Sequence, residues 1–170
     1  KKSIDPFIKK EKFDKLIFSY HGIPKRQAKK TDITGSHCFS SSDCCETICP
    51  GSSDCYKAHT VQASNKVAEK LGLSDSQWEI AYQSRLGPGW LTPFTDKRLA
   101  EMPNKDLKSV LVVCPSFISD CLETLEEIEI RGRETFFNSG GQNMTYIPCL
   151  NDSGDTINLL ESLVLESEIK

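Results

Sequence analysis

Short apolar runs alternate along the chain with segments in which apolar residues recur at helical spacing. The runs cover residues 15–18, 78–82, 109–114 and 144–147, and each is predicted to be a strand. The Val-Leu-Val-Val stretch at residues 110–113 is continuously apolar, which indicates a strand covered on both faces, as in a parallel sheet flanked by helices.

The intervening segments predict four helices. Residues 56–71 carry Val61, Val67 and Leu71 at helical spacing and are followed by Gly72, a typical helix stop. Helices are also predicted over residues 96–102, 119–137 and 154–167. This alternation predicts an α/β fold, a doubly wound four-stranded parallel sheet flanked by helices with right-handed crossovers.

Composition fits one domain with one ordinary core. The chain has 170 residues, 38% of them hydrophobic, and a net charge of −3, which disfavours a nucleic-acid partner. A basic cluster over residues 25–30 is interpreted as a solvated face. Because no apolar run reaches membrane-spanning length and no secretory leader is visible, the expected location is cytoplasmic.

His21 ends the first apolar run and precedes Gly22 and Pro24, two residues that stop a strand. It would therefore project from the carboxyl edge of the sheet, where open α/β sheets bind ligands. A lone histidine beside a strand is more often a hydrogen-bonded core residue, so on its own it does not establish a site.

A second group of candidates is acidic and begins the helix after the third strand. Asp120 and Glu123 have a structural explanation, because the helix dipole favours acids near a helix N-terminus. Glu123 and Glu127, however, are four residues apart, a spacing at which like charges repel, and a bound cation or proton would relieve the repulsion. His21 and Glu123 could face one crevice, which suits divalent-metal binding or proton transfer.

Five motifs together resemble ferrochelatase in order and spacing, over about residues 15–165. They are YHGIP at 20–24, YQSR at 82–85, WLTP with TD at 90–96, CPSFISDCLETLEE at 114–127 and YIPCLN at 146–151.

The resemblance implies a lyase that inserts ferrous iron into protoporphyrin IX, or a related porphyrin, in haem biosynthesis. Ferrochelatases are about twice this length, with two similar α/β halves around the porphyrin cleft, and residues 1–170 resemble the C-terminal half. The implied partners are porphyrin, ferrous iron and the N-terminal half, with at most peripheral contact to a membrane. The isolated half is expected to fold but to be inactive.

The resemblance also implies roles for single residues. His21 would take pyrrole protons or meet the incoming iron, Glu123 would be its acidic partner at the metal, and Asp120 would continue the acidic path with Glu127. The residues implied to lie near the porphyrin are Tyr20, Ser84, Arg85 and Trp90, and core packing is the alternative for Trp90. Some relatives carry a second histidine where this chain has Cys121, so that role is not transferred.

The segment 31–55 does not fit an α/β connection and holds five of the eight cysteines: Cys38, Cys44, Cys45, Cys49 and Cys55. In a chain expected to be cytoplasmic, such a group indicates metal ligands rather than disulfides. Four thiolates suit a 2Fe-2S cluster or a structural zinc. Because some bacterial ferrochelatases resemble this chain in carrying cysteine-rich segments that bind 2Fe-2S, the cluster is favoured over zinc, disulfides and free thiols.

The ligand set chosen is Cys38, Cys45, Cys49 and Cys55. Cys44 is an alternative to Cys45, because adjacent cysteines cannot easily both reach one metal. Two further functions remain open at this point. One is a half-length cobalt or nickel chelatase, and the second is an iron-sulfur or zinc module that senses redox state on a chelatase-like scaffold.

Overall fold

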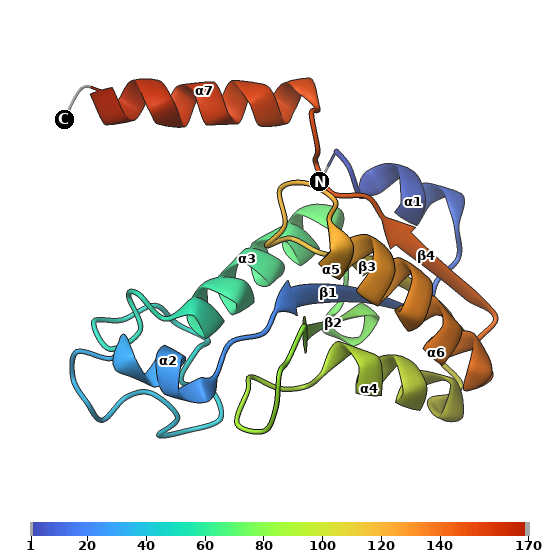
Figure 1. The fold of residues 1–170 in the computed structure, drawn as a ribbon, viewed down its shortest axis with the longest axis horizontal. Helices are drawn as coiled ribbons and strands as arrows, with labels where there is room; N and C mark the ends of the chain where they lie inside the picture. The colour runs from blue at the N-terminus through green and yellow to red at the C-terminus, as the bar shows by residue number, and fades with distance from the viewer. Residues whose placement is uncertain (1, 169–170) are drawn as a thin grey trace.

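The computed structural model describes residues 2–168 and has a four-stranded, entirely parallel sheet at its centre. The strands lie in the order β2-β1-β3-β4. Their bounds are β1 Lys15–His21, β2 Trp78–Gln83, β3 Ser109–Val113 and β4 Asn143–Ile147. The predicted doubly wound α/β fold with four parallel strands is confirmed (Figure 1).

Helices connect the strands and cover the sheet. The α-helices are α1 Asp5–Lys10, α2 Lys25–Lys30, α3 Tyr56–Leu71, α4 Thr95–Glu101, α5 Leu122–Thr124, α6 Arg133–Asn138 and α7 Gly154–Glu168. Short 3₁₀ turns occupy Asp75–Gln77 and Met102–Lys105, and a π-helix occupies Leu125–Gly132 between α5 and α6.

The two faces of the sheet form two apolar layers. On one face, Leu16, Phe18 and Tyr20 of β1 pack with residues of α1 and α3. On the other face, Ile17 of β1 packs with side chains of α4, α6 and the π-helix, including the fully buried Phe136. Because successive side chains of a strand point to opposite faces, β1 is buried along its length, as its continuous apolar run predicts.

The register of the central strands places the site residues. β1 pairs with β2 so that His21 lies opposite Gln83, and with β3 so that Phe18 lies opposite Val113. All three strands therefore end at the same edge of the sheet, where β1 ends at His21 and the loops carrying Ser84 and Ser116 depart. The expected carboxyl-edge position of His21 is thereby confirmed.

The long helix expected over residues 119–137 differs from the structure in two respects. It begins at Leu122 and contains eight residues of π-helix, in which the backbone N–H of Arg133 donates to the carbonyl of Ile128, five residues earlier. A hydrophobic spacing of three to four residues does not separate α- from π-turns, so the sequence pattern could not reveal this. The basic cluster, interpreted as a solvated face, forms the short exposed helix α2.

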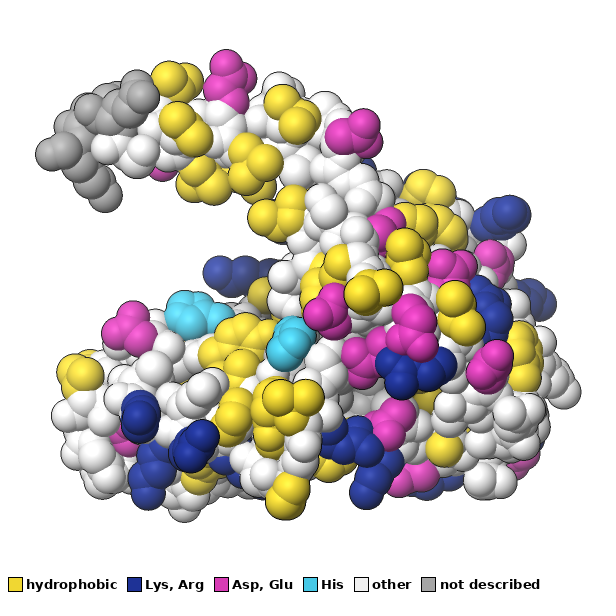
Figure 2. Space-filling model, viewed as in Figure 1, with side chains coloured by type: hydrophobic (Ala, Val, Ile, Leu, Met, Phe, Trp, Pro, Cys, Tyr) yellow, Lys and Arg dark blue, Asp and Glu magenta, His cyan; other side chains and the backbone are white. Residues whose placement is uncertain are grey.

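The last helix lies apart from the rest of the molecule. Figure 1 shows α7 separated from the sheet and its covering helices, joined to β4 by the segment 148–153. The apolar residues predicted to form one side of this helix are half exposed, with values of 53% for Ile157 and 57% for Val164. In Figure 2 apolar side chains lie along α7, both on its outer edge and on the edge that borders a deep hollow between this helix and the body.

Among residues 2–168, we find no helix both long enough and apolar enough to cross a lipid bilayer.

Candidate active site

A pocket of about 340 Å³ opens at the carboxyl edge of the sheet, where β1 and β2 end beside the π-helix. It gathers the predicted histidine, both glutamates and the predicted porphyrin-side residues except Tyr20. The pocket is lined by His21, Ser84, Arg85, Leu86, Trp90, Glu123, Glu127 and Arg131. Residues from separate sequence motifs therefore meet at one place.

His21 has one ring nitrogen committed to its own backbone. Nδ1 lies 2.7 Å from the carbonyl oxygen of Gly22, and because a carbonyl only accepts, Nδ1 carries the proton in the neutral ring. Nε2 then keeps its lone pair for a proton or a metal. The backbone of His21 is also held, since its N–H donates to Ser116 Oγ at 3.1 Å and its carbonyl accepts from Tyr56 at 2.8 Å.

Glu123 lies in the first turn of the helical segment after β3. Hydrogen bonds from Cys121 and from its own backbone N–H lower the pKa of Glu123, and the nearby His21 ring adds to this. The carboxyl group is therefore ionised near neutral pH and adds a negative charge to the pocket wall that faces His21.

Glu127 is fixed more tightly than Glu123. The backbone N–H of Ser84 donates to Glu127 Oε1 at 2.7 Å, and Ser84 Oγ donates to Oε2 at 2.6 Å. Ser84 has a φ of 59°, in the left-handed region that non-glycine residues enter rarely. The strained backbone turns both donors of Ser84 toward one carboxylate, which is a common use of strain at a functional site.

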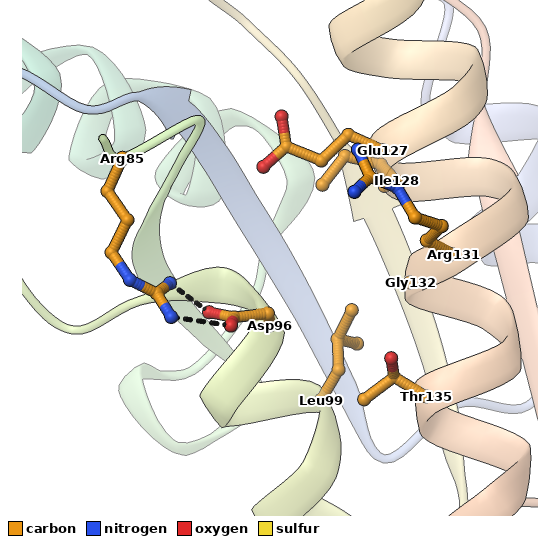
Figure 3. Close-up of a pocket in the computed structure, with 8 residues that line it drawn as sticks. All are labelled: Arg85, Asp96, Leu99, Glu127, Ile128, Arg131, Gly132 and Thr135. Carbon is orange, nitrogen blue, oxygen red and sulfur yellow. Dashed lines mark hydrogen bonds and ion pairs between the residues drawn. The ribbon is translucent and has the colours of Figure 1, made fainter. Parts of the chain in front are cut away.

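A second pocket of about 340 Å³ continues from the first along α4 and the π-helix, and the two share Arg85, Glu127 and Arg131. Figure 3 shows Arg85 pointing from the loop after β2 toward Asp96 on α4, with Glu127 extending from the opposite wall. Arg85 forms a bidentate ion pair with Asp96, with 2.7 Å between Nη2 and Oδ2, and its guanidinium lies 4.1 Å from the ring centre of Phe94. This arrangement holds Arg85 at the boundary between the pockets.

Trp90 also lines this pocket and is half-buried rather than in the core. It forms an isolated antiparallel bridge with Pro24, and a Cβ on Gly22 would come within 3.3 Å of its indole and 2.8 Å of the Gln83 carbonyl. Gly22 therefore allows the Trp90 loop to pack directly against the residue after His21.

Two predicted site residues are not brought into the pocket. Tyr20 is buried on the other face of the sheet, where its hydroxyl bonds Ser64 of α3 at 2.9 Å and burial raises its pKa to about 12. Side chains alternate along a strand, so Tyr20 and His21 cannot both face the same side.

Asp120 is engaged with the segment after β4. Its carboxylate accepts from Tyr146 at 2.6 Å, from the Asn151 amide at 2.8 Å and from the backbone N–H of Cys149 at 3.1 Å. Partial burial raises the pKa of Asp120, but these hydrogen bonds outweigh it and lower the pKa to about 2. Asp120 thus ties the loop after β3 to the loop after β4, close to the pocket but not on its wall.

The cysteine-rich segment, residues 31–55, forms a series of turns that precedes α3 in the sequence. Its thiols form two groups. Cys44, Cys45 and Cys55 are buried, and the Sγ atoms of Cys44 and Cys45 are 3.6 Å apart. Burial and the neighbouring Cys44 raise the pKa of Cys45 to about 12, and burial together with Cys55 and Cys44 raises that of Cys38. These four thiols influence one another.

Cys49 lies apart from that group, beside His37. Its Sγ is 3.6 Å from His37 Nε2, and hydrogen bonds from the Ser52 hydroxyl and the backbone N–H groups of Gly51 and Ser52 lower its pKa despite some burial. Within residues 2–168, no three His, Cys, Asp or Glu side chains converge closely enough to hold a metal ion. All eight thiols are free of disulfide bonds.

The sequence did not point to Gln83, a buried residue that contacts the helix carrying the glutamates. It is 2% exposed, and its amide donates to the carbonyl of Glu123 at 2.6 Å. A glutamine at the end of an apolar run was a weak signal, because such a position usually begins a loop. The pairing of Glu127 with Ser84 was also unforeseen.

Comparison with known proteins bears directly on this arrangement. A family model described as Ferrochelatase matches residues 1–168. The chain belongs to the ferrochelatase family. Among curated relatives, a ferrochelatase of Ectopseudomonas mendocina is 42% identical over 163 residues, which is 95% of this chain and 47% of the relative. Ferrochelatases of Stutzerimonas stutzeri and Opitutus terrae are each 44% identical, over 89% of this chain and 45% and 44% of the relatives.

This ferrochelatase-family chain therefore spans about half the length of the curated relatives that it matches.

Proposed function

We propose that the full-length protein is a ferrochelatase, a lyase that inserts ferrous iron into protoporphyrin IX or a related porphyrin in haem biosynthesis. In this proposal residues 1–170 form its C-terminal half. The observation that carries the proposal is the pocket itself, in which His21 with a free Nε2 faces two glutamates of the helical segment after β3.

Metal insertion requires that two protons leave the pyrrole nitrogens while a dication loses its waters. His21 suits the first task, because its neutral ring has Nδ1 held by the Gly22 carbonyl and Nε2 available as a base. The bond at Nδ1 also stabilises the ring once Nε2 has taken a proton, since the positive charge strengthens a hydrogen bond to a carbonyl.

Glu123 and Glu127 suit the second task. Carboxylate oxygens attract a dication such as ferrous iron and can replace its waters stepwise. Glu123 is nearer in sequence to the helix start and is ionised, while Glu127 is fixed by Ser84. Because Glu127 lines both pockets whereas Glu123 and His21 line only one, we infer that iron passes Glu127 before it reaches Glu123 and His21. Asp120 contributes by holding the loop from which this helix begins.

The porphyrin contacts come from the other wall. The indole of Trp90 offers an apolar surface for a flat macrocycle, and Leu86 beside it is 90% exposed. Arg85 supplies a cation at the pocket boundary that suits a porphyrin carboxylate. In this proposal Tyr20 supports His21 from the opposite face of the sheet rather than touching the porphyrin.

The N-terminal half is the proposed partner of this chain, supplying the facing wall of the cleft. An exposed apolar helix such as α7 needs a covering surface, and the relatives are long enough to provide one within the same polypeptide. We place the enzyme in the cytoplasm, with at most peripheral contact to a membrane.

The test is an anaerobic ferrous-insertion assay on the full-length protein with protoporphyrin IX, followed by the visible spectrum of the product. Haem formation by wild type together with its loss in His21→Ala supports the proposal. Preference for cobalt or nickel over iron would assign the chain to another chelatase, and the absence of any insertion would refute the proposed function.

We also propose that the segment 31–55 holds a 2Fe-2S cluster. The donor set suits such a cluster in number, because the segment supplies five thiols and Cys55 lies near enough to raise the pKa of both Cys38 and Cys45. Cys49 lies apart from these three, so cluster binding would have to draw it toward them. The proposed ligands are Cys38, Cys45, Cys49 and Cys55, with Cys44 as the alternative to Cys45. Such a cluster stabilises the segment when bound.

Iron and acid-labile sulfide analysis of anaerobically purified full-length protein tests this second proposal. Equal iron and sulfide, lost in Cys55→Ser, support a cluster. A comparison of Cys44→Ser with Cys45→Ser assigns the disputed ligand, because only the ligand variant loses the visible absorption. Zinc in place of iron, or no metal under these conditions, would contradict the cluster.

A further inference from the structure

Gln83 is the last residue of β2, and Ser84 follows it. These two residues lie between the two sides of the pocket. The backbone carbonyl of Gln83 accepts from Gly22 N–H at 2.8 Å, directly after His21. The side chain of Gln83 donates to the carbonyl of Glu123, and Ser84 donates twice to the carboxylate of Glu127. Two consecutive residues therefore touch the backbone beside the histidine and both glutamates.

The orientation of the Gln83 amide is determined by its surroundings. Oε1 accepts from Ser19 Oγ at 2.7 Å and from Cys114 Sγ at 3.3 Å, and Ser19 is bonded in turn to Thr95 at 2.8 Å. Exchanging the oxygen and nitrogen of the amide would place an acceptor against the carbonyl of Glu123. The network therefore presents Nε2 as a donor to that carbonyl. Because Ser19 and Thr95 are also buried, the amide is held on every side.

The bond to Glu123 coincides with the change from α- to π-helix. The α-helical turn α5 ends at Thr124, and the π-helix begins at Leu125. A side chain that binds a helix carbonyl competes with the N–H of the following turn, and such insertions are a recognised cause of local helix distortion. Gln83 binds the carbonyl of Glu123 at that junction, where the hydrogen-bond ladder widens.

We propose that Gln83 and Ser84 are positioning residues for metal delivery, Gln83 by opening the helix at Glu123 and Ser84 by directing the carboxylate of Glu127 into the pocket. This inference rests on the proposed metal-insertion function and assigns Ser84 to the metal path rather than to the porphyrin. Neither residue exchanges a proton with substrate. Their effect reaches the metal through the two glutamates.

The experiment uses the full-length protein and measures separate KM values for the divalent metal and for the porphyrin. Ser84→Ala and Ser84→Gly both remove the hydroxyl donor but keep the backbone N–H, and glycine also relieves the positive φ. Loss of one hydrogen bond to a charged carboxylate is expected to raise the metal KM about tenfold in both variants, with the porphyrin KM nearly unchanged. Different results for Ala and Gly would mean that backbone strain, not the hydroxyl, matters.

Gln83→Leu tests the other half of the inference. It fills a similar volume but leaves the carbonyl of Glu123 without its donor, so we expect kcat with saturating porphyrin to fall about tenfold or more. Ser139→Ala is the matched control, because Ser139 also bonds a helix carbonyl, that of Thr135 at 2.8 Å, but lies away from the pocket. A urea unfolding curve for each variant establishes that it is folded.

Zn²⁺ binding measured by calorimetry separates this inference from the function on which it rests. If wild type inserts metal and both Ser84 variants keep its metal KM and Zn²⁺ affinity, the positioning role is overturned. If wild type inserts no metal, the proposed function fails, and weaker Zn²⁺ binding in the Ser84 variants then still supports the positioning of Glu127. Unchanged Zn²⁺ binding in that case overturns both.

Discussion

Replacing Asp120 by alanine tests whether this residue is an anchor between loops. Its carboxylate accepts three hydrogen bonds of 2.6–3.1 Å, from Tyr146, Asn151 and the backbone of Cys149. A hydrogen bond to a charged group contributes about 1.5–3 kcal/mol. Because Asn151 and Cys149 are only half-buried, water replaces part of what is lost, and we expect Asp120→Ala to lower the free energy of unfolding by about 3 kcal/mol.

The pH dependence of the stability gives a second, independent test of the anchoring role of Asp120. The pKa of Asp120 is about 2 in the folded chain against an ordinary 3.8. A carboxyl group whose pKa is lower in the folded than in the unfolded state stabilises the fold at pH values above its unfolded-state pKa. This stabilisation is lost as the pH falls through its folded-state pKa. The difference in free energy of unfolding between wild type and Asp120→Ala should therefore be fully present at pH 6 and should shrink between pH 4 and pH 2.

The assay is urea unfolding of the 170-residue chain, followed by circular dichroism at several pH values. Asp155→Ala is the control, because its ion pair with Lys2 is 66% and 85% exposed and should contribute less than about 0.5 kcal/mol. A loss below about 1 kcal/mol for Asp120→Ala, equal at all pH values, would refute the anchoring argument. Full-length Asp120→Asn that keeps its stability but loses insertion would instead favour a direct role in proton or cation transfer.

Three further outcomes are expected. His21→Ala in the full-length protein should lower the insertion rate about 100-fold or more while porphyrin still binds, as absorbance titration would detect; an unchanged rate would remove His21 as the base. The 170-residue chain alone should show no measurable turnover in the same assay, and a rate like that of the full-length enzyme would contradict the need for a second half. Phe136→Ala should cost about 3–5 kcal/mol in urea unfolding, because the ring is fully buried and packs directly on Gly141, whereas the 40% exposed Phe137 is a control that should cost less than half as much.

The sheet was predictable because its strands are short apolar runs bounded by clear stops. The predicted helix over residues 56–71 agrees with α3 at both ends, since Gly72 takes the left-handed conformation expected after a helix. The short α1 and α2 were not predicted, because six polar-rich residues carry little periodicity. For α7 the helix itself was correctly predicted, but its apolar residues are exposed, and periodicity alone cannot tell what covers them.

The site was predictable as far as single residues carry chemistry. His21, Glu123 and Trp90 meet in one pocket, which the family resemblance implied and the parallel sheet made possible. The support around them was not predictable, because Gln83 donates to a backbone carbonyl 40 residues later in the chain. Asp120 was expected on the acidic path, and only its contacts with the segment after β4 revealed its anchoring position.

The pairing of the central strand has a consequence for how the chain folds. β1 begins near residue 15 but pairs with β2 and β3, whose partners lie about 60 and about 95 positions later, and such non-local pairing slows folding. His21 meets Gln83 only at the last pair of the β1–β2 ladder. Most of the polypeptide must therefore be synthesised and paired before the pocket exists. A nascent or partly folded chain would carry the same histidine and glutamates without bringing them together in one pocket.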